Sequence, residues 1–223
     1  GGTFNYSNSR TNGLATGSAN GAAFSSSGAA RLAFVQAPNV GPFNNDGTYN
    51  LRGNQIGYGN NLTGLQFQNA QYLLDKNTYS AQNDHIISNF YIGLKLAKGL
   101  NFKSLYGIDN LIVENKDFLD ALHGDGFADG GSATNTMNRY SRKSIQNVLD
   151  YNITLAEEHN LSALLGSERQ YSKIDAWGAT RKTVSDPFFN EYQGGFSTAI
   201  PAGNLLVENY LESYFGRINY DYN

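Results

Sequence analysis

The chain contains no cysteine in its 223 residues, which excludes a disulfide framework, a thiolate metal site and a catalytic thiol. Charged residues make up only 16% and hydrophobic residues 40%, both below the averages of soluble domains. No apolar run reaches the about 18 residues that a transmembrane helix needs. The net charge of −3 provides no basic surface for nucleic acid. These absences argue against helical membrane proteins, nucleic-acid binders and disulfide-stabilised secreted domains.

Tyrosine (15), phenylalanine (13) and glycine (25) are abundant instead, and asparagine and serine are also frequent. Aromatic residues favour strands, whereas glycine and asparagine favour turns. The composition therefore predicts an all-β protein with long, turn-rich loops. The chain opens without a starting Met, a basic segment or an apolar leader, and it stops on a strand pattern. We therefore expect both ends to lie inside a longer protein.

The last residues show the strand pattern most clearly. Alternate residues form one largely apolar and aromatic face: Tyr214, Gly216, Ile218, Tyr220 and Tyr222. The residues between them form a mostly polar face: Phe215, Arg217, Asn219 and Asp221. This period-two alternation indicates a strand whose two faces meet different surroundings. The same pattern predicts six strands: Gly2–Asn8, Tyr79–Leu96, Leu100–Val113, Tyr140–Leu155, Leu161–Trp177 and Leu205–Tyr222.

The connections between these strands alternate in length. Lys98-Gly99 and Glu157–Asn160 predict tight turns. Residues 9–77, 117–138 and 178–204 predict long loops, the first with a short helix over 29–37. Short turns at one end and long loops at the other are typical of outer-membrane barrels, which need about eight or more strands. Six strands would thus form an arc of a larger barrel, and a soluble β-sandwich is the alternative because its core face also alternates.

Four segments resemble a known family. The final strand, Leu211–Tyr222, resembles the SYFGRVNYDY strand of SusC/RagA-type TonB-dependent transporters of the Bacteroidota outer membrane. Residues Ala37–Tyr49, Leu100–Asp109 and His159–Glu168 are typical of the same family in their order and spacing. The resemblance covers essentially the whole chain.

The resemblance implies an antiparallel transmembrane barrel of about 22 strands with a plugged lumen, short periplasmic turns and long extracellular loops. It also implies import of oligosaccharides or peptides across the cell outer membrane, with a SusD-like lipoprotein lid and with energy delivered through TonB. The sequence shows no plug domain, TonB-contacting segment or closing aromatic strand. Residues 1–223 are therefore expected to be a partial barrel domain that lacks the plug, the N-terminal segments and the C-terminal strands.

Two rival functions stay open from the sequence. One is an outer-membrane receptor for another cargo, such as a siderophore. The other is a soluble secreted β-domain for adhesion or glycan binding, which would fold in water without detergent.

Substrate contact is the chemistry that the sequence supports best. Glycans and peptides bind aromatic faces flanked by amide, carboxylate and guanidinium groups. We expect such contacts from eight residues of the long loops and their margins: Tyr58, Phe67, Tyr72, Trp177, Arg181, Phe188, Phe189 and Tyr192. The alternative for each aromatic residue is packing within the loops or against the lid. Five charged residues are expected to face the lumen, where they line the channel or hold the plug: Lys95, Lys103, Asp109, Asp150 and Arg217.

Catalysis finds no support in the sequence. The histidines His85, His123 and His159 show no metal-ligand spacing, and no nucleophile elbow or P-loop is present. Four aspartates lie among the glycines of residues 117–131, and Ca²⁺ takes oxygen-rich loops of this kind. Their spacing does not match an EF-hand, so a solvated acidic loop is preferred. We expect neither an enzyme nor a bound metal or cofactor.

Overall fold

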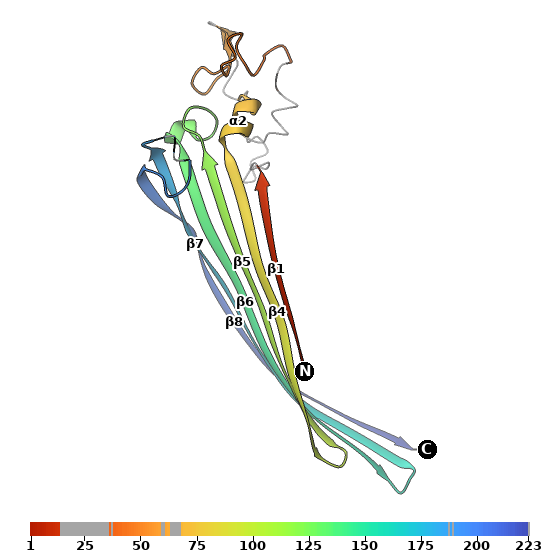
Figure 1. The fold of residues 1–223 in the computed structure, drawn as a ribbon. Coiled ribbons are helices and arrows are strands. Elements are labelled where there is room, and N and C mark those ends of the chain that lie inside the picture. The colour runs from red at the N-terminus through yellow and green to blue at the C-terminus, as the bar shows by residue number, and fades with distance from the viewer. Residues whose placement is uncertain are drawn as a thin grey trace.

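The computed structural model describes residues 1–13, 36, 38–58, 61–62, 68–186, 188 and 190–222. Its main feature is one curved and twisted antiparallel sheet, with a helix and loops at one end and two tight turns at the other (Figure 1). The strands of this sheet are β1 (Gly2–Gly13), β4 (Thr78–Ala97), β5 (Leu100–Leu119), β6 (Ser132–Leu155), β7 (His159–Val184) and β8 (Phe196–Tyr222). The smaller elements are β2 (Gly57–Tyr58), β3 (Asn61–Leu62), α2 (Ala70–Lys76) and the 3-10 helix η1 (Phe127–Asp129).

The sheet is a simple meander in the order β1-β4-β5-β6-β7-β8, and each strand pairs antiparallel with the next. The strands are 12 to 27 residues long, far above the about five to six residues of soluble sheets. The predicted all-β class and the predicted six strands are therefore confirmed. A single antiparallel layer of such long strands is consistent with part of a larger barrel.

Several strands extend further toward the loop end than predicted. The sequence predicted loops over 117–138 and 178–204, whereas the connections observed there are 120–131 and 185–195. These predicted boundaries are wrong because the additional strand residues are mostly polar or small and give no apolar alternation. Backbone pairing continues through them, supported by side-chain hydrogen bonds such as the 2.9 Å contact between the Thr134 and Thr180 hydroxyls.

Two tight turns close hairpins at the opposite end. Lys98 and Gly99 connect β4 to β5, and Gly99 adopts φ +77°, which glycine tolerates without strain. The Asn152 N–H donates to the Gly99 carbonyl at 2.9 Å, so this turn packs against β6. Residues 156–158 connect β6 to β7. Both short connections are confirmed, although the second begins one residue earlier than predicted.

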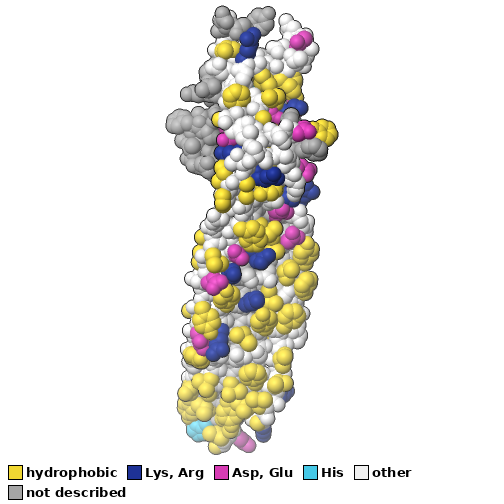
Figure 2. All heavy atoms as spheres, turned by 90° about the vertical axis from the view of Figure 1, so that its left-hand side faces the viewer, with side chains coloured by type: hydrophobic (Ala, Val, Ile, Leu, Met, Phe, Trp, Pro, Cys, Tyr) yellow, Lys and Arg dark blue, Asp and Glu magenta, His cyan; other side chains and the backbone are white. Residues whose placement is uncertain are grey.

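A single-layer sheet has no interior core of its own, and large hydrophobic side chains lie exposed along it. Leu94 is 51%, Leu165 is 65% and Ile218 is 76% exposed. Figure 2 shows that such side chains gather most densely near the end with the tight turns. The buried hydrophobic residues lie toward the loop end instead: Ile56, Tyr72, Leu73, Phe118, Ala133 and Ala176.

The helix α2 has seven residues and was not predicted. Its N-cap is Asn69, whose side-chain oxygen accepts a hydrogen bond from the Tyr72 N–H at 3.1 Å. The short helix predicted over 29–37 lies, apart from Gln36, outside the described residues. None of the described helices is long and apolar enough to span a membrane.

Candidate functional site

The two faces of the sheet differ sharply near the tight turns. Side chains alternate along a strand, and directly paired residues of neighbouring strands share a face. One row across five strands is apolar: Leu94, Phe102, Leu149, Leu165 and Gly216. The next row, on the other face, is mostly polar or charged: Lys95, Asn101, Asp150, Leu164 and Arg217. We call these the apolar face and the polar face of the sheet.

The polar face carries all five of the charged residues that were expected to face a lumen. Lys103 pairs with Gly93, and Asp109 pairs with Ile87, both on the polar face. Asp109 also lies 2.7 Å from the His85 imidazole. The register thus separates a polar surface, suited to water or a plug, from an apolar surface suited to lipid.

The apolar face becomes charged at a similar distance from each tight turn. The first charged side chains beyond the turns are Asp84 on β4, Glu114 on β5, Lys143 on β6 and Arg169 on β7. Each lies about 10 to 14 residues from the turn end of its strand, or ~33–46 Å at ~3.3 Å per residue. A strand tilt of about 45° makes this ~23–33 Å of height, close to the ~25 Å apolar band of an outer-membrane barrel.

Tyrosines lie at both margins of this apolar band. At the upper margin, the Tyr6 hydroxyl donates to Asp84 at 2.7 Å and the Tyr210 hydroxyl donates to Glu212 at 3.1 Å. Near the tight turns, the Tyr222 hydroxyl donates to Glu158 at 3.1 Å. Aromatic side chains with one apolar and one polar end are enriched at membrane interfaces. The band therefore has the boundaries that a bilayer would require.

The loop end is organised by a small packed cluster around α2. The ring of Tyr72 makes edge contacts with Tyr49 at 5.0 Å and with His123 at 5.7 Å between ring centroids. The Tyr72 hydroxyl donates to Asp120 at 2.6 Å. Burial and this hydrogen bond raise the pKa of Tyr72 far above its ordinary value. Tyr72, a predicted substrate contact, is only 3% exposed and holds two loops together.

His123 connects the same loops and is fully buried. Its Nε2 accepts the Asn69 N–H at 2.7 Å, so its Nδ1 carries the proton and donates to the Gly53 carbonyl at 2.9 Å. Burial lowers the pKa of His123, an effect that the Gly53 carbonyl and the Asp120 carboxylate partly oppose. His123 is therefore a neutral structural residue whose role has no signature in the sequence.

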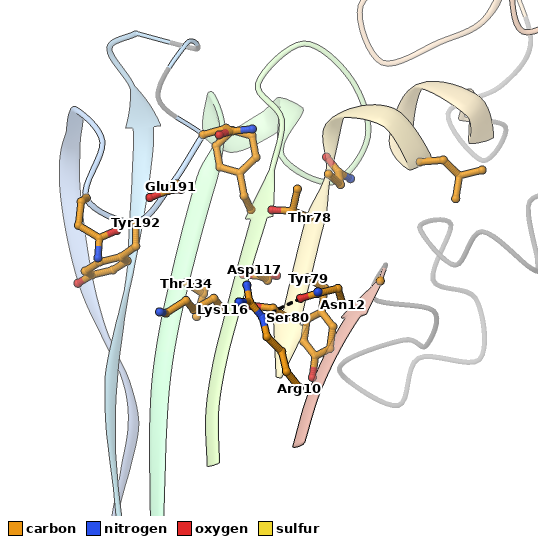
Figure 3. Close-up of a pocket in the computed structure, with 16 residues that line it drawn as sticks. Arg10, Asn12, Thr78, Tyr79, Ser80, Lys116, Asp117, Thr134, Glu191 and Tyr192 are labelled. Carbon is orange, nitrogen blue, oxygen red and sulfur yellow. Dashed lines mark hydrogen bonds between the residues drawn. The ribbon is translucent and has the colours of Figure 1, made fainter. Parts of the chain in front are cut away.

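A groove of about 830 Å³ lies at the loop end, between residues 190–193 and the ends of β1, β4 and β5 (Figure 3). It is lined mainly by groups that form hydrogen bonds, with Leu74 and Phe118 as apolar exceptions. Asp117 is one of its lining residues, and the Oδ1 atom of this carboxylate is buried and has no hydrogen-bond partner among the described residues. The charged, amide and tyrosine side chains of this groove include Arg10, Asn12, Lys116, Asp117, Asn190, Glu191, Tyr192 and Gln193.

Two of the predicted contact residues come together beside this groove. The Arg181 Nη1 donates to the Tyr192 carbonyl at 2.7 Å, and the guanidinium lies over the rings of Tyr192 and Phe196 at 5.6 and 5.2 Å. Arg181 thus fixes the loop that carries Tyr192, one of the residues that line the groove. The sequence named both residues, but their contact depends on the folding-back of residues 185–195.

Trp177 lies apart from this pair. It is paired with Met137 of β6 on the apolar face, beyond the charged margin, and is 40% exposed. The Arg139 guanidinium lies 5.2 Å from its ring. The β7–β8 register shifts between Ala176 and Gly178, so Trp177 lies opposite a bulge formed by Gly203 and Asn204 of β8.

The remaining predicted residues are described only in part. Phe188 is 82% exposed in the connection between β7 and β8. Tyr58 lies in the two-residue strand β2, and only its backbone is described. Phe67 and Phe189 lie outside the described residues.

The aspartates of residues 117–131 do not gather around one point. Asp120 accepts the Tyr72 hydroxyl and the Leu122 N–H, and Asp129 forms a 2.8 Å ion pair with Lys182. In the described part of the chain, no three histidine or acidic side chains are grouped as metal ligands would be.

Comparison with known proteins agrees with this architecture. TonB-dependent receptor P3 of Formosa agariphila is 29% identical over 192 residues, which cover 85% of this chain and 18% of that protein. Structures of the RagAB peptide transporter and of the RagAB peptide importer in its open-open state superpose with TM-scores of 0.61 and 0.60. Both share 23% identity and are matched over 81% of this chain and 20% of theirs. No protein-family model matches.

The chain therefore spans about a fifth of the length of these relatives, which are receptors and transporters rather than enzymes. Its fold superposes on part of the RagAB structures, and its register divides the six-stranded meander into an apolar and a polar face. The residues that resembled the family lie on three of those strands, β5, β7 and β8, and in the loop before α2. The chain is thus similar in sequence to a TonB-dependent receptor and similar in fold to the RagAB transporter, and its sheet has the form of a stretch of β-barrel wall.

Proposed function

We propose that this chain forms part of the wall of a TonB-dependent importer in the cell outer membrane. The importer takes up oligosaccharides or peptides together with a SusD-like surface lipoprotein. TonB acts on parts of the protein outside this chain. The observation that carries the proposal is the charged margin of the apolar face, which begins at a similar height on four neighbouring strands.

The loop-end groove is the proposed place of substrate contact within this chain. Its volume of about 830 Å³ is within the range of sites that hold small ligands. The lining offers guanidinium and amide donors, carboxylate acceptors and the Tyr192 ring, which suit hydroxyl-rich sugars or peptide backbones. The relatives named for RagAB are peptide transporters, which favours peptides as the first substrates to test.

Among the predicted contact residues, Tyr192 is the one that this proposal places against substrate. Arg181 acts through Tyr192 by holding its loop. Tyr72 acts further back, by fixing α2 against the loop that follows β5. For Tyr58, Phe67, Trp177, Phe188 and Phe189, substrate contact stays a prediction.

Uptake by cells that carry the full-length gene tests the proposal. Cells lacking the gene are complemented with wild type, Tyr192→Ala or Tyr192→Phe and supplied with labelled peptides, oligosaccharides or ferric chelates. We expect TonB-dependent uptake of peptides or oligosaccharides, with a roughly tenfold higher half-saturating concentration for Tyr192→Ala, as for loss of an aromatic anchor. Tyr192→Phe keeps the ring and should stay near wild type.

Three results would count against the proposal. Uptake of ferric chelates alone would establish the siderophore-type receptor instead. Uptake that persists without TonB would remove the energy coupling. A wild-type response in Tyr192→Ala would remove the groove as the contact site while leaving the importer intact.

A further inference from the structure

Four basic side chains lie together on the apolar face of β6 and β7, just beyond the apolar band. They are Arg139 and Lys143 on β6 and Arg169 and Lys173 on β7, and we call them the basic patch. Lys143 pairs directly with Tyr171, so Arg169 and Lys173 are its two diagonal neighbours. Diagonal neighbours on one face are about 7–8 Å apart, close enough for long side chains to reach one ligand.

Three carboxylates lie near the basic patch, and each is paired with one of its β7 cations. Arg169 forms a 2.9 Å ion pair with Glu212, and Lys173 lies 3.4 Å from Glu208 and 3.9 Å from Asp175. Asp175 is also directly opposite Arg139 in the β6–β7 register. In the described part of the chain, neither Arg139 nor Lys143 forms an ion pair, and both are exposed. Lys143, which lies opposite Tyr171 and Ile108, is therefore the cation of the patch without a neighbouring carboxylate.

The height of the basic patch above the tight turns determines which region of the bilayer it contacts, given the outer-membrane position proposed above. Lys143 and Arg169 are the first cations beyond the tight turns on the apolar faces of β6 and β7. They lie ~23–28 Å above the turns at a strand tilt of about 45°, which is the outer edge of the ~25 Å apolar band. At that level the side chains face lipid head groups, not acyl chains or the aqueous lumen.

We propose that the basic patch binds the phosphate groups of a phosphorylated glycolipid in the outer leaflet. Guanidinium and ammonium groups form strong charge-assisted hydrogen bonds to phosphate oxygens. Long basic side chains at a membrane margin extend toward the head groups while their stems cover apolar surface. Tyr171, in the middle of the patch, has the amphipathic ring typical of that level. The lipid would neutralise Lys143 and would add to the contact that Arg139 already makes with the Trp177 ring.

Lipid titration of the full-length transporter tests this site. The purified protein is titrated in detergent with phosphorylated lipid A or with enzymatically dephosphorylated lipid A, and bound lipid is counted by native mass spectrometry. We expect tighter binding of the phosphorylated form. The double variant Arg139→Gln/Lys143→Gln should weaken that binding by roughly 25-fold, at about fivefold for each cation removed near a charged membrane surface.

Two matched variants separate phosphate binding from a general effect of charge or folding. The charge-conserving double variant Arg139→Lys/Lys143→Arg should bind phosphorylated lipid A nearly as wild type does. Lys103→Gln removes a cation from the polar face and should leave binding unchanged. Heat-modifiable migration in gels confirms that each variant forms its barrel.

Equal binding of the two lipids by wild type would overturn the proposal. So would unchanged affinity in the double glutamine variant, or an equal loss in Lys103→Gln. If lipid binding were kept but a lipoprotein partner no longer co-purified, the patch would be a protein contact and the proposal would be wrong. If the protein resides in the outer membrane and imports its substrate but shows no preference for the phosphorylated lipid, only this lipid site is refuted. Absence from the outer-membrane fraction refutes the proposed function as well.

Discussion

Replacing His123 by alanine should open the loop end without disturbing the barrel wall. The substitution removes the acceptor of the Asn69 N–H and the donor to the Gly53 carbonyl, both inside the loop cluster. A buried polar group left without its partner costs about 1–3 kcal/mol. Water that enters the small cavity would satisfy part of the lost hydrogen bonding. The unpaired Asn69 N–H and Gly53 carbonyl together should therefore reduce local stability by about 2–4 kcal/mol.

The consequence is a measurable increase in local opening. At about 1.4 kcal/mol per tenfold, this loss raises the open population roughly 30- to 700-fold. Hydrogen exchange of the full-length protein reports it through peptides that cover residues 68–77 and 120–126. The Leu73 and Asn77 N–H groups, which donate to Asn69 and Leu73 carbonyls in and beside α2, should lose protection. Peptides from the paired strands should not change.

The same residue makes the loop end sensitive to acid. Burial lowers the pKa of His123 below its ordinary value of 6.5, so the folded cluster favours the neutral imidazole. Its contribution to stability is complete above about pH 6.5 and declines as the pH falls toward the lowered pKa, because the open state then takes up a proton more readily. Opening of residues 68–77, corrected for intrinsic exchange, should rise between about pH 7.5 and 5.5 in wild type.

His159 supplies the control, since it lies at the β6–β7 turn and contacts Tyr220 rather than the loop cluster. His159→Ala should leave exchange of residues 68–77 and its pH dependence unaltered. The reasoning would be refuted if His123→Ala exchanged like wild type there, or if it kept the wild-type rise in acid.

Three further predictions address the wall and its ends. Leu165→Arg places a charge in the apolar band and should reduce the stability of the barrel in liposomes by about 2–4 kcal/mol, as measured by urea titration. Leu164→Arg places the same charge on the polar face and should have little effect. Equal losses of stability in the two variants would contradict the assignment of the faces. Arg181→Ala removes the hydrogen bond and the ring contact that hold Tyr192, so proteolysis of residues 190–193 should become about tenfold faster. Arg181→Lys should give an intermediate rate. An unchanged cleavage rate would show that other contacts fix the loop. Gly99→Ala adds a side chain at a residue with φ +77°, and its Cβ would meet a neighbouring backbone carbonyl. The fraction of protein that folds into a heat-modifiable barrel should therefore fall. A wild-type fraction would mean that the turn relaxes at no energetic cost.

Alternation in the sequence was sufficient to predict the six strands and the two tight turns. It could not predict the bulge opposite Trp177, where Gly203, at φ +67°, and Asn204 of β8 face a single residue of β7. A register shift depends on both strands at once, and only one of them is visible in any window of sequence. Glycine inside a strand often marks a bulge, but Gly203 lay in the predicted loop 178–204, so this signal was not recognised.

The loop-end groove was still less accessible to sequence reasoning. Tyr192 and Arg181 could be named as an aromatic and a basic residue, but Arg10 and Lys116 joined them only through the pairing of β1, β4 and β5. Tyr72 shows the converse case. Its sequence context resembled that of an exposed binding residue, yet a hydrogen bond to Asp120, 48 positions away, places its hydroxyl inside the loop cluster.

The places where the predicted strands stopped too early have a common physical cause. The second hairpin strand was predicted to end at Val113, and the first charged residue of its apolar face is Glu114, although β5 continues to Leu119. Period-two alternation arises only where the two faces meet different solvents. Beyond the apolar band both faces carry polar side chains, so the alternation weakens while the backbone ladder continues. On β5 the predicted strand therefore ends where the apolar face ends, whereas the strands predicted at 140–155 and 161–177 extend past the margin residues Lys143 and Arg169.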